Sequence, residues 1–321
     1  MEYTNLGRTG LKVSRLCLGT MTFGWSADET TSFAILDAAA EAGINFLDTA
    51  DIYSRWVEGN TGGESETIIG KWLQGKPRRE FVIATKGRGP MWAGPNGEGL
   101  SRAHLLHAVD DSLRRLQTDY IDLYQVHWPD EQTPLEETLS ALDTLVRSGK
   151  VRYIGASNYP AWLLMKTLWV SDLHDYVRFD SLQPHHSLLH REEFERELEP
   201  MCNDQGIGVI PYSPLAAGFL TGKYTREGRS VDTTRSNSSQ IKQLVGNEKA
   251  YVAMDAVRDI ALQHNVPQAQ IALAWQLSRK AITAPIIGAR TVAQLMDVAG
   301  ATSVHLTDEE LERLNTVSDG F

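Results

Sequence analysis

The sequence predicts an α/β fold, a (β/α)8 TIM barrel with an N-terminal β-hairpin. Short apolar runs rich in β-branched and aromatic residues alternate with amphipathic helical segments along the 321 residues. Eight such runs occur, and no linker or change of composition separates them. Eight strands each followed by a helix are typical of a barrel, here as a single domain over 1–321. An open, doubly wound sheet is the alternative.

The predicted elements follow one another in the order that a barrel requires. The opening segment from Tyr3 to Val13 contains Gly7 and Thr9-Gly10 and is typical of a β-hairpin. The expected strands are 16–18, 45–48, 81–86, 121–127, 153–157, 181–183, 209–212 and 283–287. The clearest helical patterns are 28–42, 101–116, 134–148 and 191–205, with Asp28, Ser101 and Thr133 at or beside the N-cap positions.

Composition and charge exclude several classes of function. The net charge of −10 and the pI near 5.4 argue against nucleic-acid partners, which are bound through clustered Lys and Arg. No apolar run is long enough to cross a membrane, and the polar start lacks the pattern of a signal peptide. We therefore expect a soluble, cytoplasmic protein with no membrane partner. Cys17 and Cys202 are expected to be buried thiols rather than a disulfide.

Four polar residues lie at or just beyond the ends of predicted strands. Asp48, Lys86 and His127 close three of them, and Tyr53 follows the first. The carboxyl ends of barrel strands meet at one rim, where such barrels build their active sites. Each residue alone has an ordinary explanation, such as a turn, a packing contact or a satisfied histidine. Four together in these contexts favour a catalytic site.

Three segments are longer or more polar than a minimal barrel needs. Residues 55–63 and the glycine-rich 87–99 follow Tyr53 and Lys86 and are candidate substrate loops. Residues 223–243 are polar, contain three arginines and are expected to form a mobile flap. A solvated surface loop is the simpler alternative for that segment.

The motifs at the strand ends resemble those of the aldo-keto reductases from end to end. They are Leu18-Gly19-Thr20-Met21, Phe46-Leu47-Asp48-Thr49-Ala50-Asp51-Ile52-Tyr53, Ala84-Thr85-Lys86, Gln125-Val126-His127, Ile154-Gly155-Ala156-Ser157-Asn158, Pro211-Tyr212-Ser213-Pro214-Leu215 and Leu220-Thr221-Gly222-Lys223-Tyr224. Within that family the chain looks most similar to the bacterial branch related to potassium-channel β subunits and general-stress reductases.

The resemblance implies a role for each strand-end residue. Tyr53 would be the general acid that protonates a carbonyl oxygen while a nicotinamide delivers hydride. Lys86 would lower the pKa of that phenol from about 10 toward the working pH, because a cation at about 4 Å contributes roughly 4 kcal/mol at an effective dielectric constant of about 20. Asp48 would keep Lys86 charged and oriented. His127 would donate a hydrogen bond to the carbonyl.

The resemblance also implies a dinucleotide site formed by barrel loops, since the chain lacks the Gly-x-Gly-x-x-Gly fingerprint. Ser157, Asn158 and Gln183 would bind the carboxamide, and Tyr212 would stack on the nicotinamide ring. The other residues assigned to the cofactor are Gly19, Thr20, Met21, Asp48, Ser213, Pro214, Leu215, Gly218, Leu220, Gly222, Lys223, Gly288, Arg290, Gln294 and Asp297.

The expected coenzyme is NADP(H), with NAD(H) left open as the alternative. Thr291 could begin a helix whose N-terminus attracts phosphate, and Arg290 could pair with a 2′-phosphate. In the family that the chain resembles, the segment equivalent to Gly288–Asp297 usually ends with an acidic residue followed by Asn. This chain has Asp297 and then Val298.

Tryptophans near the expected rim suggest an apolar substrate pocket. Trp25, Trp56, Trp92 and Trp128 lie in or beside loops that follow strands, and each could equally pack a loop. Bulky or aromatic aldehydes and ketones, or sugar-derived carbonyls, are the expected substrates. No metal site is expected at His185, His186 and His190, because no third ligand type is suitably spaced.

The predicted function is therefore NADPH-dependent, reversible reduction of aldehydes or ketones to alcohols, with a small-molecule carbonyl or alcohol as partner. The alternative from another class is an NADP(H)-binding redox-sensing subunit with little turnover. A barrel isomerase or lyase that needs no nicotinamide is a third. The specific substrate, the physiological direction and the oligomeric state are not specified by these residues.

Overall fold

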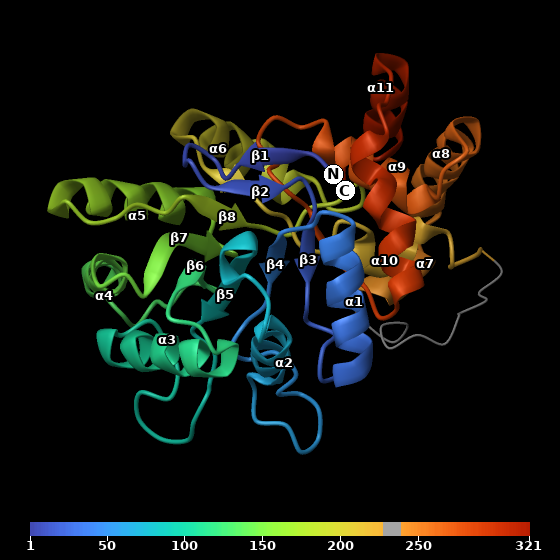
Figure 1. Cartoon of the computed structure of the whole chain (residues 1–321). Helices are drawn as coiled ribbons and strands as arrows, with labels where there is room; N and C mark the ends of the chain where they lie inside the picture. Colours follow the sequence, from blue (N-terminus) through green and yellow to red (C-terminus); the bar gives the residue numbers. More distant parts are fainter. Residues whose placement is uncertain (227–238) are drawn as a thin grey trace.

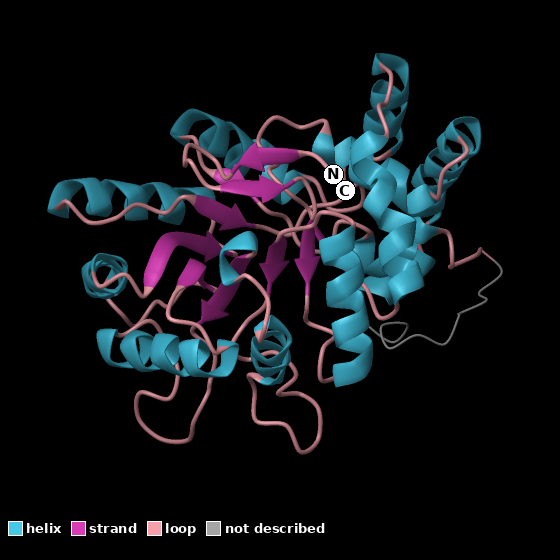
Figure 2. Cartoon of the chain, in the orientation of Figure 1, coloured by secondary structure: helices cyan, strands magenta, loops and turns pink. Residues whose placement is uncertain are grey.

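The chain folds as a (β/α)8 TIM barrel preceded by a β-hairpin, as the sequence predicts. The structure is a computed structural model that describes residues 1–226 and 239–321. Eight parallel strands curl round one another and helices pack on their outer side (Figures 1 and 2). The strands are β3 (Cys17–Gly19), β4 (Phe46–Asp48), β5 (Val82–Gly87), β6 (Ile121–Val126), β7 (Val151–Ser157), β8 (Ser181–Gln183), β9 (Gly208–Val209) and β10 (Ile286–Gly288).

The sheet closes on itself, which rules out the open doubly wound alternative. Its order is β10-β3-β4-β5-β6-β7-β8-β9, and a parallel bridge joins Val209 to Ile282 across the remaining seam. Along the same seam the Thr283 amide donates to the Val209 carbonyl at 2.8 Å, and the Ile286 amide to the Pro211 carbonyl at 2.9 Å. The last two strands are nevertheless shorter than expected, because Pro211 and Pro285 have no N–H to give to a ladder.

The helices form the outer layer. They are α1 (Glu29–Glu41), α2 (Glu64–Leu73), α3 (Arg102–Leu116), α4 (Leu135–Arg147), α5 (Ala161–His174), α6 (Glu199–Gln205), α7 (Ser239–Val245), α8 (Glu248–His264), α9 (Gln268–Leu277), α10 (Val292–Ala299) and α11 (Asp308–Val317). Shorter turns occur at η1 (Arg78–Glu80), η2 (Phe194–Leu198), η3 (Ala216–Thr221) and η4 (Gly300–Ser303).

All three residues expected at or beside an N-cap lie there, and two of them cap a helix with their side chains. The Asp28 carboxylate accepts from the Thr31 amide and the Ser101 hydroxyl from the His104 amide. Thr133 instead donates to Asp130, and Pro134 precedes α4. The helix expected over 191–205 is divided into a π-helical η2 and then α6, because Pro200 lacks the N–H that a regular turn requires.

The hairpin of β1 (Tyr3–Asn5) and β2 (Lys12–Ser14) closes the amino-terminal end of the barrel. Its Leu6 and Val13 are fully buried with side chains from the barrel interior, including Phe46. The turn approaches so closely that a Cβ on Gly7, whose φ is +54°, would lie 2.5 Å from the Gly206 carbonyl. One end of the barrel is thereby plugged, and the opposite end is left for ligands.

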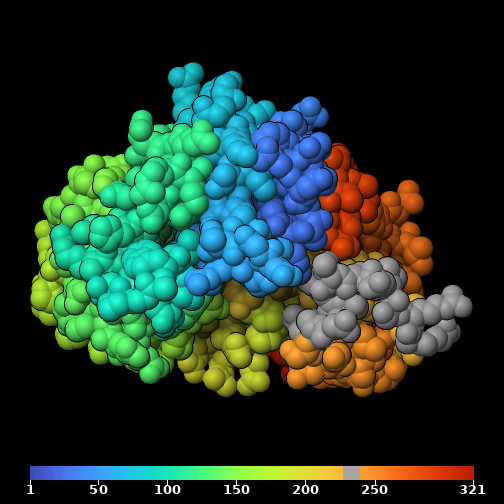
Figure 3. All heavy atoms as spheres, turned by 90° about the horizontal axis from the view of Figure 1, so that it is seen from below, coloured from blue at the N-terminus to red at the C-terminus, as the bar shows by residue number. Residues whose placement is uncertain are grey.

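The strands point toward the lower side of the barrel in Figure 1, where the loops after β4 and β5 project, and Figure 3 views the molecule from that side.

Both cysteines are buried free thiols, as expected. Within the described ranges, no helix combines the length and apolar character needed to span a membrane.

Candidate active site

Lys86 lies at the carboxyl end of β5 with its ammonium group fully buried. Its Nζ donates to Asp48 Oδ1 at 2.6 Å, to the Thr49 carbonyl at 2.9 Å and to the Tyr53 hydroxyl at 2.9 Å. An ammonium has three N–H donors, so each of them has a partner. β4 pairs with β5 in parallel, which brings Asp48 beside Lys86.

The turn after β4 holds Tyr53 above Lys86. The Tyr53 amide donates to the Ala50 carbonyl at 3.2 Å, and the hydroxyl of Ser54, whose φ is +70°, donates to the Phe23 carbonyl at 2.6 Å. The ammonium of Lys86 lies 4.7 Å from the centre of the Tyr53 ring. The phenol is therefore fixed by its backbone as well as by its hydroxyl.

The electrostatics of this pair correct one sequence-based expectation. Burial disfavours a charge on Lys86, but Asp48 and Tyr53 outweigh it and raise the pKa of the ammonium above its ordinary value. Burial also raises the pKa of the Tyr53 phenol, and the opposing effect of Lys86 only reduces that rise. The expectation that Lys86 lowers the pKa of Tyr53 toward neutrality is thus wrong for this structure. It took the charge of Lys86 to outweigh the desolvation of the phenol, whereas the reverse holds.

His127 follows β6, with its ring centre 6.1 Å from that of Tyr53. Burial, reinforced by the charge of Lys86, holds the pKa of His127 well below its usual range. Its Nδ1 is buried and has no hydrogen-bond partner within the described residues. The imidazole is therefore neutral near pH 7, with one nitrogen able to donate and the other to accept.

The second oxygen of Asp48 is held by two glutamines. Gln183 Nε2 donates to Asp48 Oδ2 at 2.9 Å and Gln125 Nε2 donates to the same atom at 3.2 Å. Gln183, assigned by resemblance to the carboxamide, thus uses its amide on the carboxylate while still lining the pocket. Gln125 was not predicted as a site residue. The alternation of β6, which places it on the same face as His127, was the signal for it.

Ser157, Asn158 and Tyr212 form a connected group beside His127. Asn158 Nδ2 donates to the His127 carbonyl at 2.9 Å and to the Ser157 hydroxyl at 3.1 Å. The Tyr212 hydroxyl donates to Asn158 Oδ1 at 2.9 Å. The ring of Tyr212 is backed by His185, with ring centres 5.1 Å apart and planes 6° from parallel. His190 continues the stack at 3.8 Å from His185.

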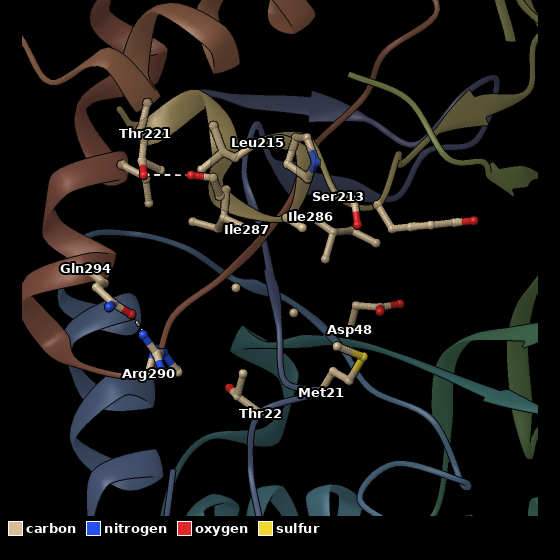
Figure 4. Close-up of a pocket in the computed structure, with 18 of the residues that line it drawn as sticks. Met21, Thr22, Asp48, Ser213, Leu215, Thr221, Ile286, Ile287, Arg290 and Gln294 are labelled. Carbon is tan, nitrogen blue, oxygen red and sulfur yellow. Dashed lines mark hydrogen bonds between the residues drawn. The ribbon is translucent and has the colours of Figure 1, made fainter. Parts of the chain in front are cut away.

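A pocket of about 690 Å³ begins at these residues and extends toward α10. In Figure 4, Asp48 and Met21 lie at one end and Arg290 with Gln294 at the other, and Leu215 and Ile287 lie between them. The predicted residues that line it are Gly19, Met21, Trp25, Asp48, Tyr53, His127, Ser157, Asn158, Gln183, Tyr212, Ser213, Pro214, Leu215, Gly218, Lys223, Gly288, Arg290, Gln294 and Asp297.

Three residues assigned to the cofactor do not line the pocket. Thr20 is buried beneath the pocket, where its hydroxyl donates to the Asp48 carbonyl at 2.9 Å. Leu220 is buried among the side chains of the C-terminal helices. Gly222 faces Gln268, whose amide would clash with a Cβ there. These three support the walls and do not form them.

Several lining residues were not predicted from the sequence. They are Thr22, Ser26, Ala217, Thr221, Pro267, Gln268, Ala269, Ile286, Ile287 and Val298. Most carry no polar group that would single them out, and Pro267, Gln268 and Ala269 reach the pocket from the start of α9. These residues come together at the pocket only in the folded chain.

The far end of the pocket lies at the N-terminus of α10. Thr291 caps this helix, as predicted, by accepting from the Gln294 amide. The Arg290 amide donates to Gln294 Oε1 at 2.9 Å. The free amide groups and the dipole of a helix N-terminus favour anions, and Arg290 adds a positive charge.

Three residues that line this pocket have a strained backbone. Asn158, Ser213 and Ala217 line it with φ values of 59°, 55° and 54°, a region that residues with a Cβ seldom adopt. Such strain persists where the surrounding structure enforces it, typically at ligand sites.

The four tryptophans lie in different surroundings. Trp25 lines the pocket and packs edge-on against Trp56, with ring centres 5.6 Å apart. Trp56, 49% exposed, also lies 6.2 Å from the Tyr53 ring. Trp128 lies against His127. Trp92 packs on His104 of α3 outside the pocket, which favours its role in loop packing.

The remaining candidates lie elsewhere. In the parts of the chain that the structure describes, no cluster of three His, Cys, Asp or Glu residues is arranged to hold a metal ion. His186 is bound to Glu195 and to Gln276. The expected flap over 223–243 lies largely outside the described residues. Arg226, at its start, pairs with Glu248 and Asp255.

Comparison with known proteins agrees with this fold. The sequence model of the aldo/keto reductase family matches residues 15–319. An uncharacterized oxidoreductase, YrpG, of Bacillus subtilis is 44% identical over 326 aligned residues, which cover all of this chain and 97% of that protein. The versiconal hemiacetal acetate reductase of Aspergillus parasiticus is 37% identical, with 98% of this chain and 96% of that protein covered. The protein Tas of Escherichia coli is 36% identical over 99% and 97% respectively.

The closed barrel and these relatives place the chain in a class of oxidoreductases that reduce carbonyl groups. The chain belongs to the aldo/keto reductase family.

Proposed function

We propose that this protein is an NADPH-dependent reductase that converts aldehydes or ketones to alcohols and can run in reverse. One observation carries the proposal. The Tyr53 hydroxyl, 2.9 Å from the buried Lys86 ammonium, lines the end of a long pocket whose other end has Arg290 at a helix N-terminus. A proton donor and an anion site joined by one pocket suit a reaction between a carbonyl and a dinucleotide.

The residues along the pocket fit a nicotinamide dinucleotide phosphate. Ser157, Asn158 and Tyr212 offer hydroxyl and amide groups beside the end of the pocket that contains Tyr53. The strained segment at Ala217 and Gly218 brings the backbone close to the middle of the pocket. Arg290 offers the guanidinium that distinguishes a 2′-phosphate from a hydroxyl. When bound there, the coenzyme supplies the hydride that reduces the carbonyl carbon.

The chain's own residues supply the proton. The raised pKa of Tyr53 keeps the phenol protonated at neutral pH, so it can donate to the carbonyl oxygen as hydride reaches the carbon. The phenolate that forms is stabilised by the ammonium of Lys86, which Asp48 keeps charged. His127, neutral and half-buried, donates a hydrogen bond that orients the carbonyl.

Relatives that bear reductase names support the reaction class. The Aspergillus parasiticus protein is named for the reduction of versiconal hemiacetal acetate, and it aligns with nearly the whole chain. We infer a carbonyl compound as substrate here and leave its identity to experiment.

A plate assay tests the proposal. The purified chain is mixed with NADPH or NADH and a panel of aliphatic, aromatic and sugar-derived carbonyls, and the loss of nicotinamide absorbance is followed. We expect turnover with several carbonyls and a higher kcat/KM with NADPH. No turnover with any carbonyl, together with tight retention of the coenzyme, would instead support a redox-sensing binding subunit.

A further inference from the structure

Helix α5 exposes a continuous apolar stripe on the outside of the barrel. Trp162 is 65% exposed, Met165 39%, Trp169 60% and Leu173 63%. At 3.6 residues per turn, these four positions fall within an arc of about 80°. They include two of the molecule's eight tryptophans, residues that soluble proteins usually bury for the most part.

The opposite face of α5 is apolar as well. Leu164, Leu168 and Val170 are buried, and Leu164 and Leu168 belong to the core between the helices and the sheet. A helix that is apolar on both faces is typical of one covered on both sides. The barrel lies along one side of α5 (Figure 1), and the stripe is the face left exposed.

We propose that the stripe, Trp162, Met165, Trp169 and Leu173, is the interface through which two copies of this chain associate about a two-fold axis. Met165 and Leu173 lie four residues before and four residues after Trp169. These three positions are therefore similarly spaced when the helix is read in either direction, and Trp162 extends the stripe toward the N-terminus of α5. An antiparallel copy of α5 places Trp169 against its counterpart, with Met165 at the level of the other copy's Leu173, which is the self-complementarity that a two-fold interface requires.

The area of the stripe is suited to a modest dimer. Four side chains with these exposures present about 400 Å² of apolar surface, already the size of the largest patch on many monomers. Two such stripes with their flanking atoms reach the roughly 1,000 Å² at which specific interfaces begin. We therefore expect a dissociation constant of about 1–10 μM rather than a permanent complex.

The charges around the stripe disfavour a membrane as occupant. Helices that lie on lipid surfaces are rich in Lys and Arg along their polar face. On α5 the one lysine, Lys166, is accompanied by Asp172, which pairs with Arg178 at 2.5 Å. The chain also has a net charge of −10, which opposes binding to anionic lipids.

Sedimentation equilibrium of the full chain from about 1 to about 100 μM tests the proposal. We expect a monomer–dimer equilibrium for the parent protein. Trp169→Glu and Trp169→Lys should each weaken association at least about 100-fold, because the two-fold axis brings like charges together. An equimolar mixture of the two variants should recover the dimer, because opposite charges then meet.

Leu262→Glu is the matched control, since Leu262 is 73% exposed on α8 and lies outside the stripe. It should associate like the parent. Because Trp169 is mostly exposed, both charged variants should keep the parent's far-ultraviolet circular dichroism and melting temperature. These readouts do not depend on catalysis, so a failure of the proposed function leaves the test intact.

Three results would overturn the proposal. One is a parent protein that stays monomeric at every concentration. Another is a Trp169→Glu variant that dimerises like the parent. The third is binding of the monomeric parent to neutral phospholipid vesicles that Trp169→Glu abolishes, which would assign the stripe to a lipid surface.

Discussion

The Tyr53 hydroxyl lies 2.9 Å from the Nζ of Lys86; the lysine side chain is fully buried, and the tyrosine is half-buried at the wall of the pocket. This contact joins a protonated phenol to an ammonium that does not lose its charge at neutral pH. In the proposed reaction, it makes the phenol a proton donor whose conjugate base is stabilised in advance. The pH dependence, the stability and the activity of the protein should all report on this pair.

The raised pKa of Tyr53 gives the two directions of the reaction opposite responses to pH. Carbonyl reduction needs the phenol, so its kcat/KM should stay flat from pH about 6 to about 9. Alcohol oxidation needs the phenolate, so its kcat/KM should rise about tenfold per pH unit over the same range. Initial rates in both directions in constant-ionic-strength buffers would measure this. A reduction rate that falls above pH about 7 would restore the expectation of a phenol that titrates near neutrality.

Asp48→Asn should destabilise the fold, because it leaves the buried Lys86 ammonium without its counter-charge. Removing one partner of a buried ion pair costs about 3–5 kcal/mol of unfolding free energy. The folded-state pKa of Lys86 is raised above its unfolded value, so the pair's contribution is fully present below pH about 10 and is lost as pH rises through the folded value. Urea unfolding at pH 7 and at pH about 10.5 should show the deficit shrinking at the higher pH, because the buried ammonium of Asp48→Asn, without its counter-charge, loses its proton more readily than the unfolded chain does.

The matched control is Asp172→Asn, which removes an exposed carboxylate that pairs with Arg178. Its free energy of unfolding should lie within about 1 kcal/mol of the parent value. If the two variants lost equal stability, the buried ion pair of Asp48 and Lys86 would contribute no more to the fold than an exposed pair does.

Arg290→Ala should reduce the preference for NADPH over NADH. A charged hydrogen bond to a phosphate contributes about 1.5–3 kcal/mol, so the dissociation constant for NADPH should rise about 10- to 100-fold while that for NADH changes little. Fluorescence titration with each coenzyme measures this directly. Arg8→Ala, near Gly206 at the plugged end of the barrel, is the control and should leave both constants unchanged. Equal weakening for both coenzymes would place the 2′-phosphate elsewhere.

His185 should act by positioning Tyr212. Its ring lies parallel to that of Tyr212 at 5.1 Å. Because aromatic stacking contributes about 0.5–1.5 kcal/mol, His185→Ala should raise the KM for the coenzyme about 2- to 10-fold with little change in kcat. His185→Phe keeps a flat ring and should restore the parent value. A loss of kcat that His185→Phe does not recover would indicate that His185 has a role in proton transfer.

Much of the architecture could be predicted from local patterns. The eight strands have strong apolar runs with polar ends, and the caps at Asp28 and Ser101 are local signals. The strand lengths near Pro211 and Pro285 differ because proline removes donors that the apolar pattern does not register. The break at Pro200 has the same cause.

The site was predictable where chemistry and strand position coincide, as at Lys86, and less so where the environment decides. The burial that raises the pKa of Tyr53 depends on packing by distant segments, so weighing the charge of Lys86 against desolvation from the sequence gave the wrong direction. Gln125 and the start of α9 contribute through contacts far apart in the sequence. Leu220 belongs to one of the motifs that resemble the family, yet its side chain packs in a buried apolar cluster and does not line the pocket.

The most direct test of the central claim is the rate of hydride transfer by Tyr53→Phe in a single turnover. The variant keeps the aromatic ring above Lys86 and loses only the hydroxyl, so binding of NADPH should stay within about twofold of the parent. Without the general acid, reduction of a reactive aldehyde should slow about 10²- to 10⁴-fold. Stopped-flow absorbance that shows the parent rate in Tyr53→Phe would contradict the account.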